Sequence, residues 1–193
     1  MDALPTHARI LNAAADVFLQ HGYAASSMEM VRQVAGVSNG SLYHHFPTKA
    51  RLADALYAHT LHDFHAALLP CLAADASAEA AVRGMLRAYV AWVLAHPGRA
   101  RLLHDLRREG PLTDDGEWSK ERAQTFDALA QWVSAQTAQG QMREMPFPVW
   151  LALVFAPALS LTHHWVRQPT PKVSAAVRNA LERAAWLAVS PDA

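Results

Sequence analysis

The sequence predicts an all-α fold of about nine helices, with an N-terminal three-helix domain of the helix-turn-helix type and a larger C-terminal helical domain. Apolar residues recur with the period of a helix along most of the chain, and no sustained alternation predicts a strand. Clusters of proline, glycine and polar residues separate the helical segments. With 193 residues, of which 52% are hydrophobic and 18% charged, the chain can bury a large core.

The first two helices are predicted from their apolar faces and end signals. Ala14 and Val17 share one face of the first helix, and Gly22 is expected to end it. The stretch "SSME" has the form of a capping box, in which Ser26 caps the second helix and Glu29 reaches back to it.

The second helix is expected to bury Val31, Val34 and Ala35, and Gly36 is placed to adopt a positive φ in the turn that follows. Two short helices separated by this "AGVS" turn predict a helix-turn-helix, although a generic helical hairpin has the same spacing.

The third and fourth helices follow at once. Ser38 is expected to cap a third helix that runs to Phe46 and buries Leu42 and Phe46. Pro47 ends this helix, and Thr48 is expected to cap the fourth.

Longer helices are expected over residues 77–95, 98–109, 117–138, 147–167 and 172–189, separated by breaks at 96–98, 110–116, 140–146 and 168–171. The apolar run from Val149 to Leu161 is too short to span a bilayer and is broken by Pro157, so it predicts a helix buried on most sides. We expect no membrane attachment and a cytoplasmic location, because the N-terminal residues show no secretory signal and the single Cys71 suits a reducing compartment.

Residues 8–56 combine Phe18 with Gly22-Tyr23, the "AGVS" turn, the "LYHHF" stretch, and Lys49 directly after Pro47-Thr48. In this combination the segment resembles the DNA-binding region of the TetR family of transcriptional regulators. The resemblance implies a homodimer that binds a palindromic operator in double-stranded DNA, most often as a repressor released by a small-molecule effector. It implies no cofactor and no enzymatic activity.

On this basis residues 1–50 are expected to form the DNA-binding domain, and residues 51–193 the effector-binding and dimerisation domain with its connecting helix.

DNA contact is expected on the exposed face of the third helix. At 100° per residue, Asn39, Gly40, Tyr43 and His44 share a face opposite Leu42. Small Gly40 lets the backbone approach a major groove, and the Asn39 amide can read adenine. The full predicted DNA-binding set is Ser27, Ser38, Asn39, Gly40, Ser41, Tyr43, His44, His45 and Lys49.

Within that set the resemblance implies Tyr43, His45 and Lys49 as backbone anchors, and we expect Asn39 and His44 to read bases. Residues 1–60 contain four Lys or Arg against four Asp or Glu, so a modest salt dependence per monomer is expected. Binding is expected to strengthen at lower pH as the histidines gain charge.

Two residues depart from the family pattern. Arg32 stands where a small residue usually packs against the recognition helix, so its guanidinium is expected to reach outward to phosphate or the two helices to sit wider. Glu29 places a carboxylate near the DNA-facing start of the second helix, which is unfavourable toward phosphate.

The C-terminal helices carry aromatic stripes with isolated polar groups, a composition typical of a small-molecule pocket and equally of an ordinary core. The predicted effector-binding set, for a hydrophobic or aromatic molecule, is Met85, Tyr89, Trp92, His104, Phe126, Trp132, Trp150, Val154 and His163. Arg87, Arg101 and His104 are candidate partners for an anionic group. A regulator without any small-molecule effector is the alternative.

A homodimer is expected to form through residues 147–189, as a four-helix interface. The residues expected to be buried there are Leu159, Ala176, Val177, Ala180, Leu181, Ala184 and Leu187, unless they pack on their own domain instead.

Two other kinds of site concern a metal ion and an enzyme. His59, His62 and His65 recur every three residues and leave a metal sensor as an alternative, although no metal site is assigned because no familiar ligand set is completed nearby. No nucleophile elbow, phosphate-binding glycine loop or metal-ligand motif indicates an enzyme.

Overall fold

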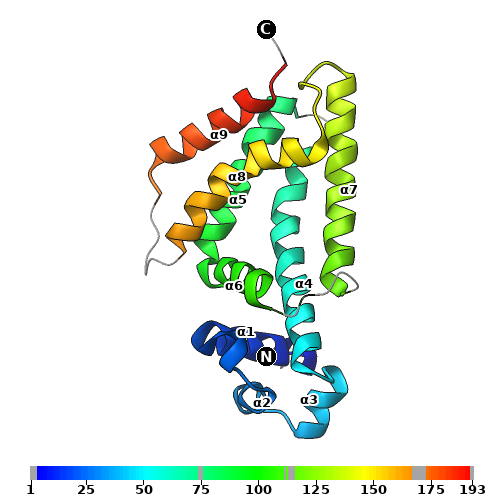
Figure 1. Ribbon diagram of the computed structural model, residues 1–193, viewed down its shortest axis with the longest axis vertical. Coiled ribbons are helices and arrows are strands. Elements are labelled where there is room, and N and C mark those ends of the chain that lie inside the picture. Colours follow the sequence, from blue (N-terminus) through cyan, green and yellow to red (C-terminus); the bar gives the residue numbers. More distant parts are fainter. Residues whose placement is uncertain (1–3, 74–75, 111, 113–115, 167–172, 192–193) are drawn as a thin grey trace. The chain divides into compact units, whose positions relative to one another are not determined.

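The computed structural model describes residues 4–73, 76–110, 112, 116–166 and 173–191. Within these ranges the chain forms α-helices and one short 3-10 helix but no strand (Figure 1), which confirms the predicted all-α class. The helices are α1 (Thr6–Ala25), α2 (Met28–Ala35), α3 (Asn39–His45), α4 (Lys49–Leu68), η1 (Leu69–Leu72), α5 (Ala78–Ala95), α6 (Pro97–Glu109), α7 (Glu117–Ala138), α8 (Phe147–Trp165) and α9 (Ala175–Val189). The break predicted at 168–171 lies outside the described residues.

The chain divides into two compact units. Unit 1 is Met1–His62 with Gly98–Arg122, and unit 2 is Asp63–Pro97 with Ala123–Ala193. Unit 1 therefore contains α1 to α3 and nearly all of α6, unit 2 contains α5, α8 and α9, and α4 and α7 contribute residues to both. The boundary predicted at residue 50 separates two functions, whereas these units are defined by packing. The functional boundary therefore remains a prediction.

Unit 1 is built on one hydrophobic cluster. Ile10 of α1, Val31 of α2, Leu42 of α3 and Leu52 of α4 are fully buried in it, together with Trp118 of α7. Burial of such side chains contributes about 1.5–3 kcal/mol each, so this cluster holds the short helices α2 and α3, which would be marginal alone.

The turn between α2 and α3 is fastened to α1. Gly36 has φ 62° and ψ 40°, the left-handed conformation predicted for it. The Arg9 guanidinium donates to the carbonyl oxygens of Ala35 at 2.7 Å and Gly36 at 3.0 Å. One arginine thus satisfies carbonyl groups at the end of α2 that the helix itself leaves free.

The start of α2 differs from the prediction. Ser27, not Ser26, is the N-cap and accepts from the Met30 amide at 3.2 Å. Ser26 is buried and its hydroxyl donates to the Gly22 carbonyl oxygen instead. Gly22 has the expected positive φ, 77°, but it kinks α1 rather than ending it.

The predicted capping-box role of Glu29 is also wrong, because its carboxylate bonds to Arg32 and Gln33. Val34 is 57% exposed although it was expected to be buried. An eight-residue helix packs through one narrow stripe, here Val31 and Ala35.

The ends of α3 and α4 agree with the prediction. Ser38 caps α3 and accepts from the Ser41 amide at 3.2 Å, and Phe46 is buried as the residue that ends α3. Thr48 accepts from the Arg51 amide at 3.1 Å at the start of α4.

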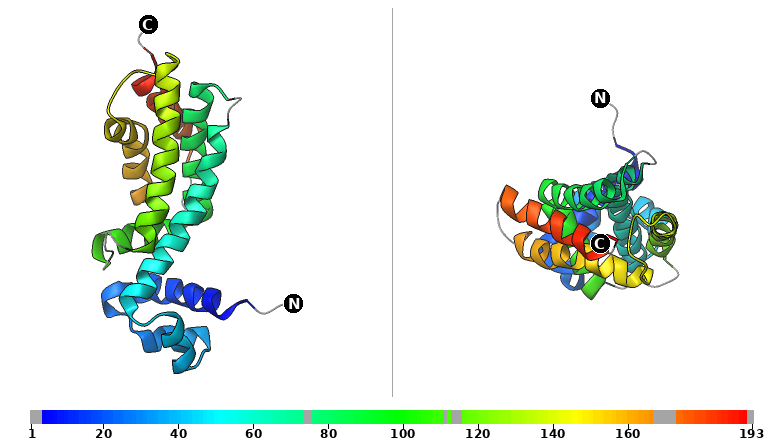
Figure 2. Two further views of the ribbon diagram at one scale, coloured as in Figure 1. Left: turned by 90° about the vertical axis from the view of Figure 1, so that its right-hand side faces the viewer. Right: turned by 90° about the horizontal axis from the view of Figure 1, so that it is seen from above.

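Unit 2 packs α5 against α8 and α9, and the view from above in Figure 2 shows α9 alongside α8. Arg87 on α5 forms two hydrogen bonds to the buried Glu182 carboxylate on α9, at 2.6 and 3.2 Å. The carboxylate raises the pKa of Arg87, mainly through its hydrogen bond.

Helix α8 agrees with the predicted range but not with the predicted burial. It continues through Pro157, which lies on the exposed side, so the missing backbone hydrogen bond falls on the outer face. It is not buried on most sides, because Trp150, Val154, Ala158 and Thr162 form a single buried stripe. By length and composition α8 is apolar enough to cross a membrane, and 22% of its most apolar 18-residue window is buried.

Candidate functional sites

The face of α3 predicted to contact DNA is exposed. Asn39, Gly40 and His44 are all exposed, as is Tyr43 with 49% of its surface, whereas Leu42 on the opposite side is fully buried. Apart from Ser41, Asn39 and the backbone of α3 itself, no described heavy atom lies within 4 Å of the place where a Cβ on Gly40 would be. The fold therefore presents a row of neutral polar and aromatic groups on a small helix.

Lys49 is placed differently from the prediction. Its ammonium group donates to the carbonyl oxygens of Tyr23 at 2.9 Å, Ser26 at 2.8 Å and Ala24 at 3.4 Å. It also lies 4.4 Å from the centre of the Tyr23 ring, within cation–π range. In this conformation the Lys49 ammonium is directed at the end of α1 rather than offered to a phosphate.

The two histidines at the end of α3 are both exposed and their rings are 5.5 Å apart. His45 also lies 5.9 Å from the ring of His7 on α1, in an edge-to-face arrangement. His44 is therefore the more available of the pair, and His45 has both a packing contact and an exposed surface.

Arg32 forms an ion pair within α2. Its guanidinium donates to both carboxylate oxygens of Glu29, at 2.6 and 2.8 Å, and to the Val37 carbonyl oxygen at 3.4 Å. The hydrogen bonds from Arg32 and then Gln33 lower the pKa of Glu29 to about 2. The two residues that depart from the family pattern thus neutralise each other, and Arg32 is not extended outward as expected.

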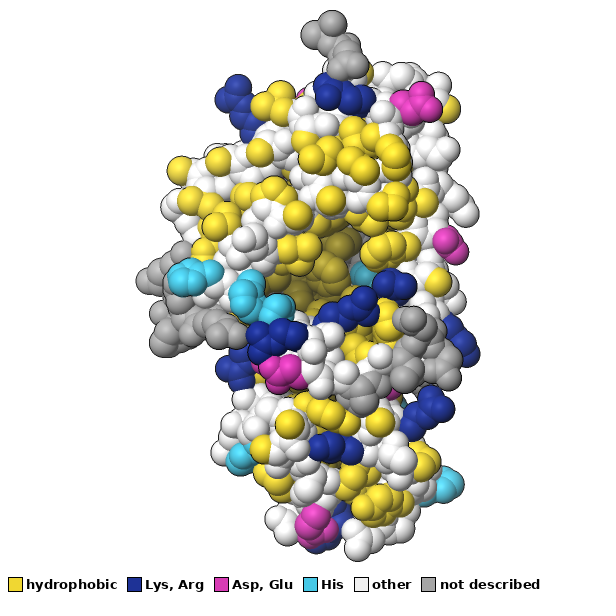
Figure 3. Space-filling view, in the orientation of Figure 1, with side chains coloured by type: hydrophobic (Ala, Val, Ile, Leu, Met, Phe, Trp, Pro, Cys, Tyr) yellow, Lys and Arg dark blue, Asp and Glu magenta, His cyan; other side chains and the backbone are white. Residues whose placement is uncertain are grey.

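Unit 2 contains a chain of aromatic rings that joins five of the predicted effector residues. Centre-to-centre distances are 5.1 Å for Trp92–Phe64, 5.8 Å for Phe64–Tyr89, 6.3 Å for Tyr89–Phe155, 6.4 Å for Phe155–Trp150, 6.3 Å for Trp150–Trp132, 6.3 Å for Trp150–Phe147 and 6.2 Å for Phe147–Phe126. The predicted Met85 and Val154 are buried in the same unit. Figure 3 shows a hollow lined by hydrophobic side chains on the face drawn there.

Polar atoms lie within this apolar chain of rings. The Tyr89 hydroxyl and the Thr162 hydroxyl form a short hydrogen bond, and Thr162 also donates to the Ala158 carbonyl oxygen at 2.8 Å. Burial raises the pKa of Tyr89. His65 and Thr125, both buried, are joined at 2.8 Å. Trp150 is fully buried, and its indole nitrogen Nε1 has no hydrogen-bond partner in the described structure.

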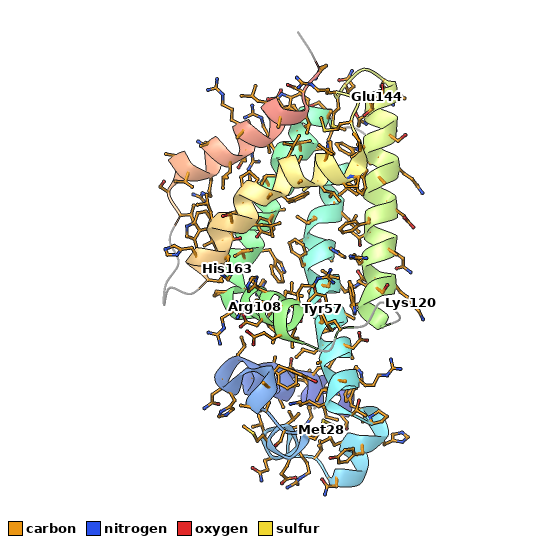
Figure 4. All side chains as sticks on the ribbon, viewed as in Figure 1. Met28, Tyr57, Arg108, Lys120, Glu144 and His163 are labelled. Atoms are coloured by element: carbon orange, nitrogen blue, oxygen red, sulfur yellow. The ribbon has the colours of Figure 1, made fainter. Side chains whose placement is uncertain are left out.

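Not every predicted effector residue joins the ring chain. His104 and Arg101 lie on α6 in unit 1, and Arg101 donates to the Leu19 carbonyl oxygen. Arg87 is engaged by Glu182. His163 lies on the last turns of α8, where Figure 4 labels it. The candidate anion partners are therefore used in other contacts or lie in the other unit.

The three histidines of α4 are not gathered into a metal site. His65 is buried against Thr125, His62 lies 3.3 Å from the Glu121 carboxylate, and His59 is exposed. Among the described residues no group of three or more His, Cys, Asp or Glu is placed to hold a metal ion.

Exposed apolar residues gather on α8 and α9. Leu159 is 53% exposed, Leu187 56% and Val177 37%, and Ala176, Ala180 and Ala184 are also exposed. Leu181 was expected on the same surface but is buried within unit 2. The predicted interface residues thus form a free apolar face with that one exception.

Comparisons with known proteins agree with the helix-turn-helix. Residues 10–56 match the family "Bacterial regulatory proteins, tetR family". Residues 10–56 thus carry the DNA-binding segment of that family. Over 55 residues the chain is 42% identical to the HTH-type transcriptional regulator UidR of Escherichia coli K12, a match that spans 28% of this chain and 28% of UidR. A longer match of 132 residues, 26% identical, covers 68% of this chain and 94% of the uncharacterized HTH-type transcriptional regulator TtgW of Pseudomonas putida.

The similarity in fold to known structures covers nearly the whole chain. The crystal structure of a TetR-family transcription regulator from Marinobacter aquaeolei VT8 superposes with a TM-score of 0.82, covering 97% of this chain and 96% of that one at 18% identity. At this identity the likeness is one of fold. The C-terminal helices thus have the same arrangement as those of the neighbour, although few of their side chains are identical.

Several residues that shape these sites gave no signal in the sequence. Phe64, Phe147 and Phe155 link the predicted aromatic residues into one chain of rings, but none shares a helical stripe with Tyr89 and Trp92. Arg9 resembles any surface arginine until the fold places it against Gly36. Contacts between distant segments account for both omissions.

Proposed function

We propose that the chain is a DNA-binding transcriptional regulator, a repressor that binds a palindromic operator as a homodimer and is released by a small hydrophobic or aromatic effector. The observation that carries the proposal is the exposed face of α3, with Asn39, Gly40, Tyr43 and His44 above the buried Leu42, inside the segment that matches the TetR family. No enzymatic activity and no cofactor are part of the proposal.

The face of α3 supports recognition through neutral groups. The Asn39 amide carries the donor and acceptor pair that suits adenine in a major groove. The Tyr43 ring suits a sugar or a thymine methyl group, and its hydroxyl suits a phosphate. Ser27, Ser38, Ser41, His44 and His45 complete the proposed contacts. Lys49 would have to leave the Tyr23 carbonyl oxygen to reach a phosphate, so it is not among the proposed contacts.

The cations of the helix-turn-helix are largely engaged within the protein. Arg9 and Lys49 donate to backbone carbonyl oxygens, and Arg32 pairs with Glu29. Each protomer is therefore proposed to neutralise few phosphates, and useful affinity requires two protomers on one site. The exposed apolar face of α8 and α9 is proposed to form that dimer, in the cytoplasm.

The aromatic chain of unit 2 supports the effector site. It offers large apolar rings with a few buried polar atoms, the composition of a small-molecule site. An effector acts by binding one conformation better than the other, so it has to change how these rings or their helices pack.

The test is selection of DNA fragments from the source genome on purified protein, followed by a salt titration of the best fragment. We expect enrichment of one palindrome bound by two protomers, and about tenfold weaker binding by Tyr43→Ala. Asn12→Ala, at an exposed position of α1, serves as a control that leaves binding unchanged. If no fragment is enriched at low salt, the helix-turn-helix is a scaffold and the proposal fails.

A further inference from the structure

We propose that the effector is an uncharged aromatic molecule with an acceptor oxygen, and that this oxygen accepts a hydrogen bond from Trp150 Nε1. The inference rests on the proposed function and names the chemical class that its effector site takes. Among the described residues, Trp150 is fully buried and its Nε1 donor has no acceptor. A buried donor without a partner is rare in folded proteins, and a ligand that supplies the acceptor removes the penalty.

The surroundings of Trp150 define the rest of the ligand. Phe147 stacks on the indole with ring planes 13° apart, and Trp132 and Phe155 meet it at steep angles. These three rings are each only partly buried, whereas Trp150 has no exposed surface. A flat aromatic ligand can therefore take over the contacts of one covering ring when that ring swings outward.

The polar partners of unit 2 argue against a charged ligand. The two arginines of α5 are paired with carboxylates, Arg83 with Glu79 and Arg87 with Glu182, each at 2.6 Å. His65 is joined to Thr125. A carboxylate placed beside Trp150 would lose its hydration without gaining either arginine, whereas a carbonyl or ether oxygen needs one donor only.

The same geometry explains how binding changes the protein. In the present conformation the indole donor is unsatisfied and its covering rings are closed. In the ligand-bound conformation the donor is satisfied and a covering ring has moved. The ligand therefore has a differential affinity for the two states, which is what release from DNA requires.

The test compares matched ligands that differ in one group, a carbonyl against a methylene: acetophenone with ethylbenzene, benzophenone with diphenylmethane, and 9-fluorenone with fluorene. Affinities are measured by equilibrium dialysis for the wild type, Trp150→Phe and Trp186→Phe. The comparison of ratios cancels the different solubilities of the two ligands in water. We expect Trp150→Phe to shift the carbonyl-to-methylene affinity ratio of at least one pair about 5- to 10-fold against the carbonyl. Trp186→Phe, on α9 and outside the predicted effector set, keeps the Trp150 donor and leaves the ratio unchanged.

A second measurement uses only the wild type, in case Trp150→Phe does not fold. One of the six tryptophan indole N–H signals in a ¹H–¹⁵N spectrum is expected to shift downfield with the carbonyl ligand and not with its methylene partner. Equal ratios in wild type and Trp150→Phe, or no saturable binding in any pair, would overturn the inference. Either of these outcomes would leave the result of the DNA selection, and with it the proposed regulator, unaffected. Conversely, if the DNA selection fails but the affinity ratio depends on Trp150, the proposed regulator function is rejected and the ligand site stands.

Discussion

Lys49 is bound to Tyr23 twice, because its ammonium group donates to the Tyr23 carbonyl oxygen at 2.9 Å and lies 4.4 Å from the centre of the Tyr23 ring. Lysine at this place in the chain was expected to anchor a phosphate. Instead it joins the first turn of α4 to the last residues of α1 and to the residue before the α2 cap. The first role of this lysine is thus to hold the helices of unit 1 together.

Lys49→Ala is expected to destabilise the protein by about 1–2 kcal/mol, since several charge-assisted hydrogen bonds and a cation–π contact are lost from a partly exposed site. The measurement is urea denaturation followed by circular dichroism. Arg51→Ala removes a positive charge from an exposed position two residues along α4 and is the matched control, expected to change stability by less than about 0.5 kcal/mol, the range of a neutral surface substitution. Equal stability of the two variants would mean that Lys49 does not hold α1.

The salt dependence of DNA binding separates the two roles of Lys49. If its bonds to α1 persist on DNA, Lys49→Ala leaves the slope of log affinity against log salt unchanged. A phosphate contact would lower that slope by about 1. We expect the unchanged slope.

Glu29→Gln is expected to lower stability at neutral pH and to have no effect near pH 2. Hydrogen bonds from Arg32 lower the pKa of Glu29 to about 2, below its usual value of 4.5. Because the pKa of Glu29 is lower in the folded state, its ionised carboxylate stabilises the protein at pH values above 4.5. That contribution disappears as the pH falls toward 2. Denaturation at a series of pH values checks this. Glu144→Gln, at an exposed glutamate of unit 2 (Figure 4), controls for the change of side chain. A Glu29→Gln difference that persists at pH 2 would contradict the ion pair.

Thr162→Val is expected to cost about 1–2 kcal/mol, because it removes the partner of the buried Tyr89 hydroxyl. Thr60→Val is a close control. Thr60 is equally buried and its hydroxyl also donates to a carbonyl oxygen one turn back, that of Leu56 at 2.8 Å, but it holds no tyrosine. Urea denaturation of both variants should show the larger loss for Thr162→Val. Equal losses would show that the Tyr89 contact contributes nothing.

Leu159→Glu and Leu187→Glu are expected to convert the proposed dimer into monomers, since each buries a charge in an apolar interface. Sedimentation velocity at micromolar concentration gives the answer. Val34→Glu alters an equally exposed valine of α2 and should leave the dimer intact. A wild type that is monomeric and sediments with phosphatidylcholine vesicles would show instead that the apolar face of α8 meets a membrane.

The sequence was sufficient for the helices, because apolar periodicity, caps and breakers are local signals. Ser38, Gly36 and Thr48 act as predicted, since each interacts with backbone within a few residues. The cap of α2 was assigned to Ser26 instead of Ser27 because either serine can cap the helix by local spacing. The choice depends on the hydrogen bond from Ser26 to Gly22 in the bent end of α1, which is not a local signal of α2.

The contacts in the candidate sites that the sequence did not reveal join residues far apart in the chain. Lys49 and Tyr23 are 26 positions apart, and Arg87 and Glu182 are 95 apart, so neither pair has a signature in a single sequence. The burial of Leu181 beside the exposure of Leu187 depends on how α9 is rotated against α5 and α8. Helical spacing identifies a stripe, but it does not say which partner covers it.

The open space around Gly40 has a consequence for how this chain responds to selection. Nothing in the fold forbids a methyl group there, and alanine favours a helix over glycine by about 1 kcal/mol. A library randomised at residue 40 and sorted by heat resistance alone should therefore fill with alanine. The same library sorted on the selected DNA should keep glycine, and glycine lost from both pools would refute a close approach at this residue. Gly40 would then be kept for the contact with DNA and not for the stability of the isolated protein.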